Sequence, residues 1–262
     1  MAMTGSATPR VDVLGVGISC VTLNTTVDIF DSWIAAEASH YVCVTGMHGV
    51  MESQTDSALR EIHNRSGLTT PDGMPMVWAG RHCGATISRV YGPDLMHAVL
   101  ARANEVGWSN YFVGGAPGAI ECLLDTLRDA YPDLVVAGHA CPPFRPLSAE
   151  EDASLVARIN AAAPDIIWVG LGTPKQERWM SEHRAALHAP VLVGVGAAFD
   201  LVSGRLAQAP PWMRRNGLEW FFRLWTEPRR LWRRYLLNIP RFAVALLRRP
   251  PRLWPESAAS GP

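Results

Sequence analysis

One carboxylate of this sequence stands in a turn from which it could remove a proton from a substrate. Asp72 and Gly73 follow Pro71 in the segment LTTPDGMPMVWAG, which is rich in residues that favour turns. An Asp-Gly pair is usually only a turn. A carboxylate at the rim of a pocket can also act as the general base that deprotonates a sugar hydroxyl. Both interpretations of Asp72 and Gly73 stay open at this point.

A second group of candidate residues follows the apolar run DIIWVGLG. In GLGTPKQERWM, Thr173 suits the N-cap of a helix, Pro174 suits its first turn, and Gln176 stands three residues after the cap. A capping box would explain these residues without any ligand. Because the segment leaves a predicted buried strand, Gly172, Pro174 and Gln176 are also candidates for a loop that binds substrate.

Two further signals are weaker. His48 lies in the turn after a strand that ends at Thr45, where it could act as an acid, a base or a helix cap. A histidine that faces solvent is the simpler interpretation. The glycines of Gly15-Val16-Gly17 and Gly194-Val195-Gly196 begin a dinucleotide fingerprint, but the third glycine is missing from both. Glycine at the exit of a strand explains these two pairs.

Six short apolar runs bounded by glycine predict parallel strands. The runs begin at Val11, Tyr41, Asn110, Leu134, Asp165 and Pro190. The segments between them have the apolar spacing of helices. Because the runs are apolar throughout, we expect a Rossmann-like α/β fold, with a parallel sheet covered by helices on both faces. Such sheets bind ligands at the carboxyl ends of their strands, where the candidate residues stand.

The charges of the chain sum to zero but are unevenly distributed. Residues 205–262 contain 12 Arg, no Lys and three acids, so this segment carries about +9 and the first 204 residues about −9. The segment interleaves arginine and tryptophan, as in WFFRLWTEPRRLWRRY, and has no strand-like run. Arginine suits phosphate and tryptophan suits the membrane interface. We therefore predict an α/β catalytic core over residues 1–204 and a mainly helical, basic appendage over residues 205–262 that binds membranes.

Cysteine usage and hydropathy narrow the class of protein further. The five cysteines form no C-x-x-C pair, so neither a zinc site nor a disulfide framework is predicted. The chain has no apolar stretch long enough to span a bilayer and no signal peptide at its N-terminus. We expect a cytoplasmic protein, peripheral on the inner face of the cell membrane, with no metal and no cofactor.

Five motifs in order resemble those of the WecG/TagA/CpsF group, glycosyltransferase family 26, which includes N-acetylmannosaminyl and N-acetylmannosaminuronyl transferases. They are TPDGMP, SRVYGPDLM, GLGTPKQERWM, GVGAAFDLVSG and APPWMRRNGLEWFFRLWTEPRRLWRRY, and the likeness covers about Val11 to Leu247. The resemblance implies an inverting, metal-independent transfer from a UDP-sugar to a polyprenyl-diphosphate-linked sugar in bacterial cell-wall or exopolysaccharide assembly.

The resemblance also implies roles for single residues. Asp72 matches the family's catalytic base, and Thr45 and Gln176 match residues that contact the donor or acceptor sugars. Arg89 matches a residue near the diphosphate, and Asp200 a residue that contacts the nucleotide.

Three arginines of the basic segment match family arginines that close over the site and neutralise the leaving UDP. They are Arg223, Arg230 and Arg233. One position departs from the family, since many members have Asn two residues after the threonine, where this chain has Met47. The resemblance therefore does not fix the donor sugar, and His48 is a candidate for part of the missing polar role.

Two other functions stay open. Parallel strands with glycine-rich exits also describe a nucleotide-cofactor oxidoreductase, although both fingerprints are incomplete. A non-catalytic membrane adaptor would use only the basic segment and would not need Asp72, Arg89 and Gln176 at strand ends. Charge alone does not distinguish anionic lipid from nucleic acid. On the resemblance we expect no nucleic-acid partner, and the family allows a homo-oligomer.

Overall fold

A computed structural model describes residues 8–116 and 118–255, which divide into two compact units. Unit 1 is made of three stretches of chain: the residues up to Thr22, Thr45–Tyr91 and the residues from Ala209 onward. Unit 2 is made of Leu23–Val44 and Gly92–Gln208. This division differs from the predicted one at residues 204 and 205, because the residues from Ala209 onward cluster with the residues up to Thr22 and with Thr45–Tyr91 rather than forming a unit of their own.

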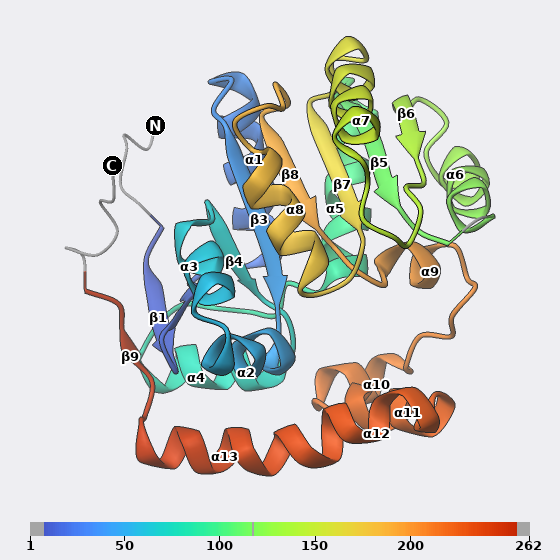
Figure 1. Ribbon diagram of the computed structural model, residues 1–262. Coiled ribbons are helices and arrows are strands. Elements are labelled where there is room, and N and C mark those ends of the chain that lie inside the picture. The colour runs from blue at the N-terminus through green and yellow to red at the C-terminus, as the bar shows by residue number, and fades with distance from the viewer. Residues whose placement is uncertain (1–7, 117, 256–262) are drawn as a thin grey trace. The chain divides into compact units, whose positions relative to one another are not determined.

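Unit 2 is a parallel sheet between two layers of helices (Figure 1). Its strands pair in the order β3 (His40–Thr45), β8 (Val191–Gly194), β7 (Ile166–Gly170), β5 (Ser109–Gly114) and β6 (Val135–Ala140). With β4 (Leu68–Pro71) at the start of the strand order, the sheet has six strands. The predicted Rossmann-like α/β class is confirmed.

Helices cover both faces of the unit 2 sheet. Figure 1 shows α7 (Ala149–Ala161) and α8 (Lys175–His183) on the near face, and α1 (Leu23–Ala35) and α5 (Gly92–Val106) on the far face. The remaining helices of the unit are α6 (Ala119–Ala130) and α9 (Ala198–Val202). Because both faces are covered, the central strands are buried along their length. The indole Nε1–H of buried Trp168 donates to Asn110 Oδ1 at 2.9 Å, which satisfies the polar group of the largest core side chain.

Unit 1 begins with a β-hairpin where a parallel strand was predicted. The strands β1 (Arg10–Val13) and β2 (Val16–Ser19) are antiparallel. Leu14 and Gly15 reverse the chain with φ angles of 57° and 88°, a left-handed pair typical of two-residue hairpin turns. A third strand, β9 (Arg252–Leu253), pairs antiparallel with β1, although no strand was predicted after residue 203. The prediction of a parallel strand from Val11 is therefore wrong.

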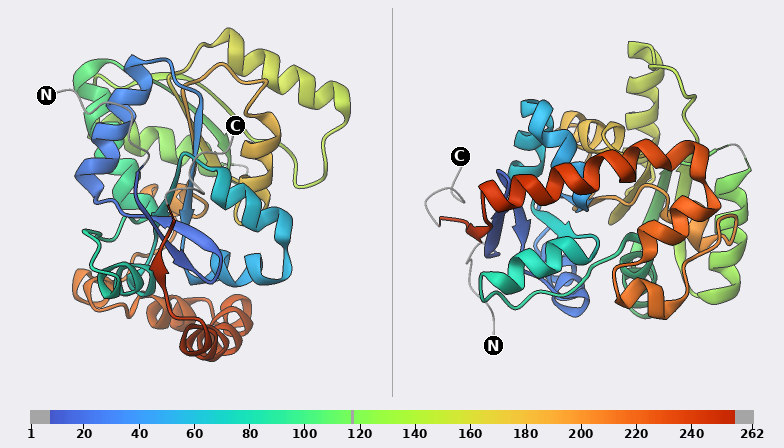
Figure 2. Two further views of the ribbon diagram at one scale, coloured as in Figure 1. Left: turned by 90° about the vertical axis from the view of Figure 1, so that its left-hand side faces the viewer. Right: turned by 90° about the horizontal axis from the view of Figure 1, so that it is seen from below.

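The helices of unit 1 come from distant parts of the sequence. They are α2 (Met47–Thr55), α3 (Ser57–Arg65), α4 (Met74–His82), α10 (Pro211–Arg215), α11 (Glu219–Thr226), α12 (Pro228–Trp232), the π-helical η1 (Arg233–Leu237) and α13 (Asn238–Arg248). The α13 helix packs against α2 and leads into β9, as the view from below in Figure 2 shows. Its Phe242 is 5% exposed and belongs to the same core as Val11, Val13 and Val50.

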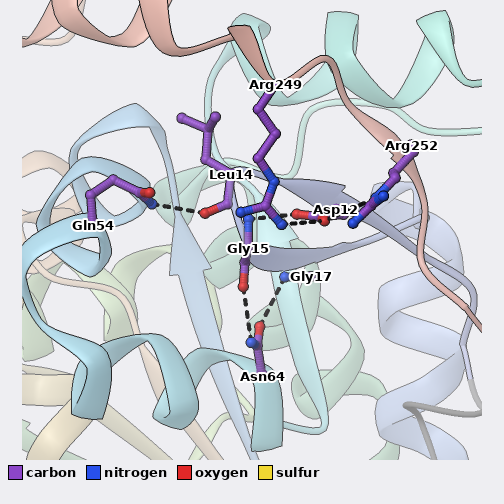
Figure 3. Close-up of polar contacts among 8 residues, drawn as sticks. All are labelled: Asp12, Leu14, Gly15, Gly17, Gln54, Asn64, Arg249 and Arg252. Carbon is purple, nitrogen blue, oxygen red and sulfur yellow. Dashed lines mark hydrogen bonds and ion pairs between the residues drawn. The ribbon is translucent and has the colours of Figure 1, made fainter.

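Polar contacts also hold the hairpin of unit 1 to the residues that follow α13 (Figure 3). The buried carboxylate of Asp12 accepts hydrogen bonds from the Gly15 N–H at 2.5 Å, Arg249 Nη2 at 2.8 Å and Arg252 Nε at 3.4 Å. On the other side of the turn, Asn64 Nδ2 donates to the Gly15 carbonyl oxygen at 3.0 Å. Residues after 208 are therefore part of the core and of the polar network of unit 1.

Candidate active site

Asp72 lies between the end of β4 and the start of α4, in unit 1. Its N–H donates to the carbonyl oxygens of Thr45 and Thr70, both at 3.0 Å. Gly73 follows with φ of 95°, a conformation that glycine adopts without strain, and α4 begins at the next residue. The turn is confined to Asp72 and Gly73, since the LTTP segment before it is a buried strand that the sequence analysis did not predict.

The last residue of β3, Thr45, lies beside Asp72. A methyl group added at Gly46 would lie 2.6 Å from the Asp72 carbonyl oxygen, so only glycine allows the two loops to approach so closely. The buried Thr45 Oγ1 has no hydrogen-bond partner within the described residues. A buried hydroxyl without a partner is costly, so this atom is a candidate to bind a ligand or a water molecule.

His48 stands in the first turn of α2, one residue after the helix begins, and not in the turn before it as predicted. Its Nδ1 lies 3.7 Å from Glu52 Oε1, one helical turn further on. This arrangement keeps His48 within three residues of Thr45 but gives it a partner on its own helix.

The segment that carries Arg89 runs beside the end of β4. The Val90 N–H donates to the Pro71 carbonyl oxygen at 3.0 Å, which fixes this segment next to Asp72. In extended chain alternate residues share a side, so Arg89 and Tyr91 both lie opposite Val90. The guanidinium carbon of Arg89 stands 4.1 Å from the centroid of the Tyr91 ring, within the range of a cation-π contact.

Two charged residues of α11 complete this cluster. Glu219 is the first residue of the helix, and its Oε2 forms an ion pair with Arg89 Nη2. Arg223 follows one turn later, with Nη2 3.9 Å from Glu227 Oε1. The side chains of Arg89, Glu219 and Arg223 are 14%, 16% and 17% exposed. Charges this well covered interact more strongly than surface ion pairs, because little water screens them.

Burial and the surrounding charges shift the pKa of the Tyr91 hydroxyl. Burial raises the pKa of Tyr91 well above its usual value, and the neighbouring carboxylates of Glu219 and Asp72 raise it further. A hydrogen bond to Glu219 adds to this shift, whereas the positive charge of Arg223 opposes it. The phenol is therefore a neutral hydrogen-bond donor, and Asp72, Glu219 and Arg223 are all close enough to act on it.

In unit 2 the candidate residues gather at the carboxyl ends of the strands. Strands β6 and β7, which follow β5 in the chain, lie on opposite sides of it, and this is the switch point where such sheets bind ligands. The Gly115 N–H donates to the Gly170 carbonyl oxygen at 3.2 Å. A methyl group at Gly114 would lie 2.7 Å from the same oxygen, so the two strand exits touch through their backbones.

Gln176 is buried at this edge, but not as part of a capping box. Its Oε1 accepts from the Gly172 N–H at 3.2 Å, and its Nε2 donates to Glu177 Oε1 at 3.1 Å. The N-cap of α8 is Pro174, without a side-chain cap bond. The predicted cap at Thr173 is therefore wrong, because the Thr173 hydroxyl donates to Glu177 Oε1 at 2.9 Å instead of capping the helix.

Asp200 lies on α9 of unit 2, where Arg205 Nε stands 3.5 Å from its Oδ1. Within residues 8–116 and 118–255, no group of three or more His, Cys, Asp or Glu side chains is placed to hold a metal ion. In the same part of the chain, no helix has the length and apolar character needed to cross a membrane.

Comparison with known proteins assigns these residues to a family. The family profile described as glycosyl transferase WecG/TagA/CpsF matches residues 11–255. The chain belongs to this family. It is similar to the N-acetylglucosaminyldiphosphoundecaprenol N-acetyl-beta-D-mannosaminyltransferase of Bacillus subtilis (strain 168), with 32% identity over 190 residues, 72% of this chain and 71% of the relative. The protein of the same name from Bacillus spizizenii is 32% identical over 198 residues, 75% of this chain and 74% of the relative.

Membership of the WecG/TagA/CpsF family makes the chain a glycosyltransferase. Of the residues expected to carry the reaction, unit 1 brings together Thr45, Asp72, Gly73, Arg89 and Arg223. Unit 2 brings together Gly172, Pro174 and Gln176, with Asp200 on α9. Arg230 and Arg233 fall in α12 and η1, and their side chains lie outside the described part of the structure.

Sequence reasoning missed three polar residues of these groups: Tyr91, Glu219 and Glu177. Two of them had a detectable signal. Tyr91 stands two residues after Arg89, so an extended segment places both on one side. Glu219 stands four residues before Arg223, so a helix places both on one face. Tyr91 and Glu219 could therefore have been found from the period of the element that each shares with a predicted site residue, whereas Glu177 had no such signal.

Proposed function

We propose that the chain transfers a sugar from a UDP-sugar to a polyprenyl-diphosphate-linked acceptor, with inversion at the anomeric carbon and without a metal ion. The observation that carries the proposal is the position of Asp72 beside a cluster of two arginines and one neutral phenol. The donor is proposed to be N-acetylmannosamine-like or a related hexose or uronate. The names of both Bacillus relatives support a lipid diphosphate acceptor.

Asp72 is proposed to act as the general base. Its carboxylate accepts the proton of the acceptor hydroxyl as that oxygen attacks the anomeric carbon. The new carbon–oxygen bond forms on the face opposite the departing diphosphate, which inverts the anomeric configuration. The backbone bonds from Asp72 N–H to Thr45 and Thr70, together with the close approach of Gly46, hold this carboxylate in place.

The cationic side chains are proposed to stabilise the leaving group. When the glycosidic bond breaks, its electron pair stays on the diphosphate of UDP, and negative charge develops there. Arg89 and Arg223 are little exposed and lie around the same phenol as Asp72, so they can stabilise that charge in place of a divalent cation. In unit 2, the switch point at the carboxyl ends of β5 and β7 supports binding of the nucleotide sugar there.

The residues after 208 are proposed to associate with the membrane that holds the lipid acceptor. Large apolar side chains are exposed along this segment between its arginines. They include Trp212, Phe221, Trp225, Trp232, Leu236, Leu237 and Leu247. Tryptophan and arginine together suit the interface of an anionic bilayer. Membrane binding would bring Arg223 and its neighbours to the surface where the acceptor resides.

The test is release of UDP by the full chain from a panel of UDP-sugars. The assay contains a polyprenyl-diphosphate-linked N-acetylglucosamine analogue and EDTA, and NMR of the product gives its anomeric configuration. We expect acceptor-dependent release in EDTA and inversion of configuration. The substitution Asp72→Asn should lower kcat by about 10²- to 10⁴-fold, the usual range for loss of a general base.

Asp129→Asn is the matched control, because Asp129 is an exposed carboxylate on α6 and its loss should leave kcat unchanged. Unchanged turnover by Asp72→Asn would refute the role of Asp72. Loss of activity in EDTA that added Mg²⁺ restores would refute the metal-independent mechanism, and a retained configuration would refute inversion.

A further inference from the structure

Arg89 and Tyr91 direct two hydrogen-bond donors at one carboxylate. Arg89 Nη2 pairs with Glu219 Oε2, and the Tyr91 hydroxyl also bonds to Glu219. The guanidinium lies over the phenol ring, so the two donors are held side by side. A cation and a neutral hydroxyl fixed in this way form a binding site for an oxyanion, and here a glutamate of the chain itself occupies it.

The glutamate leaves part of this site unused. Arg89 Nε is buried and has no hydrogen-bond partner within the described residues. A guanidinium fork binds phosphate through two parallel bonds, whereas Glu219 engages it through Nη2. A phosphate group offers more acceptor oxygens than a carboxylate, so it can satisfy donors that Glu219 leaves unpaired.

The charges around Tyr91 argue that Glu219 and an anionic ligand exclude each other. Asp72 already places one carboxylate near the phenol, and Glu219 places a second. A diphosphate arriving while both remain would meet two negative charges at positions with little solvent screening. With Glu219 withdrawn, the same diphosphate would meet Arg89, Arg223 and the Tyr91 hydroxyl.

We propose that Arg89 and Tyr91 form a phosphate-binding pair, and that Glu219 occupies this pair in the ligand-free protein and is displaced by a phosphate of the donor. The proposal rests on the proposed function, and it adds Tyr91 as a ligand-binding residue and Glu219 as an internal competitor. Glu219 is the first residue of α11 and follows Gly217, whose φ of 72° makes the turn into that helix. Rotation of this one side chain withdraws the carboxylate without unwinding α11.

The test is calorimetric binding of UDP and of inorganic diphosphate to the full-length protein and its variants. If Glu219 occupies the pair in nine of ten ligand-free molecules, it raises the apparent Kd about tenfold. Glu219→Gln should therefore bind both ligands about tenfold more tightly than the wild type. Tyr91→Phe, which removes only the hydroxyl, should bind both ligands more weakly.

Glu61→Gln is the matched control, because it makes the same change of net charge at an exposed position of α3 in unit 1. Tighter binding by Glu219→Gln with no change in Glu61→Gln supports displacement. Unchanged or weaker binding by Glu219→Gln overturns the proposal, since it would mean that the carboxylate holds Arg89 in place for the ligand. Equal tightening in both variants also overturns it, because net charge alone would then explain the gain.

Glu219→Asp provides a second measurement if the glutamine variant does not fold. It keeps the charge but draws the carboxylate back by one methylene, so binding should again tighten. These assays need no sugar transfer. If the binding changes are as expected but the protein transfers no sugar, the result counts against the proposed function alone. If the protein transfers sugar normally but the binding changes are absent, the result counts against this inference alone.

Discussion

Phe242 on α13 allows the strongest test of how the residues after 208 belong to unit 1. Its side chain is 5% exposed and packs in one core with the hairpin residues Val11 and Val13 and with Val50 of α2. Truncation of a buried phenylalanine to alanine costs about 3–5 kcal/mol, from the lost transfer free energy and the cavity left behind. For a chain of this size, each kcal/mol lowers Tm by about 2–4 °C, so Phe242→Ala should lower the Tm of unit 1 by roughly 6–20 °C.

Hydrogen exchange measured by mass spectrometry would show where the stability is lost. We expect Phe242→Ala to accelerate amide exchange in β1, β2 and α2, while β7 and β8 of unit 2 keep their protection. Circular dichroism during heating gives the accompanying fall in Tm.

Leu247→Ala is the matched control on the same helix. Leu247 is 85% exposed, so its truncation should change stability by no more than about 0.5 kcal/mol. A cost below about 1 kcal/mol for Phe242→Ala, or exchange indistinguishable from that of Leu247→Ala, would refute the argument that α13 completes the core. The segment would then be a detachable appendage, as its sequence had suggested.

Two other predictions concern the pH dependence of stability and the binding of membranes. Burial lowers the pKa of His63 to about 4 from an ordinary 6.5, so between these pH values the unfolded chain binds a proton that the folded chain does not. About 3 kcal/mol of the free energy of unfolding, present above pH 6.5, is therefore lost as the pH falls to about 4. Denaturant titrations at several pH values should show that the free energy of unfolding depends less on pH in His63→Gln, and as strongly as in the wild type in the control His82→Gln, which alters an exposed residue of α4. An unchanged pH dependence in His63→Gln would contradict the role of His63. Trp225 is 78% exposed, and Trp225→Ser should weaken co-sedimentation with anionic phospholipid vesicles about fivefold or more. The control Phe144→Ser alters an equally exposed (79%) residue of unit 2 and should not weaken it. Equal effects of the two substitutions would contradict a membrane role for the segment after 208.

The sequence predicted the strands of unit 2 because burial on both faces leaves a continuous apolar run. β3, β5, β7 and β8 have this pattern and were identified from it. Two segments were predicted wrongly for physical reasons: the one at Val11 was predicted as a single parallel strand, and the one at Leu68 as part of a turn. The first contains a left-handed turn at Leu14 and Gly15, which divides one apolar run into two antiparallel strands. The second, LTTP, is polar in composition, and its threonines are buried through tertiary contacts that no local pattern records.

The division into units could not be predicted from composition. The amino-acid composition does change after Ser203, but α13 packs in one core with the hairpin at the start of unit 1, and β9 pairs with β1. Contacts between residues more than 200 positions apart leave no local signal. The assignment of the first 204 residues to the catalytic core and of residues 205–262 to an appendage therefore stays a prediction about function, while the packing follows another division.

The candidate site was predicted in part. Asp72, Arg89 and Gln176 came from turn chemistry and from the family motifs, and the structure places each at the end of a strand or beside one. Tyr91 and Glu219 escaped notice because a tyrosine and a glutamate on their own have many ordinary roles. Their significance depends on the approach of α11 to the segment after α4, which only the fold specifies.

The pairing of β1 with β9 also affects how the protein is made. Unit 2 is complete once Gln208 has left the ribosome, so it can fold while the rest of the chain is still being translated. Unit 1 has to wait, because its hairpin lacks Phe242 until α13 emerges, and Asp12 lacks Arg249 and Arg252 until later still. During that interval, the hairpin residues that pack against Phe242 in the finished core remain uncovered. A message truncated after codon 208 would encode all of unit 2 but would leave unit 1 without α10 to α13 and β9.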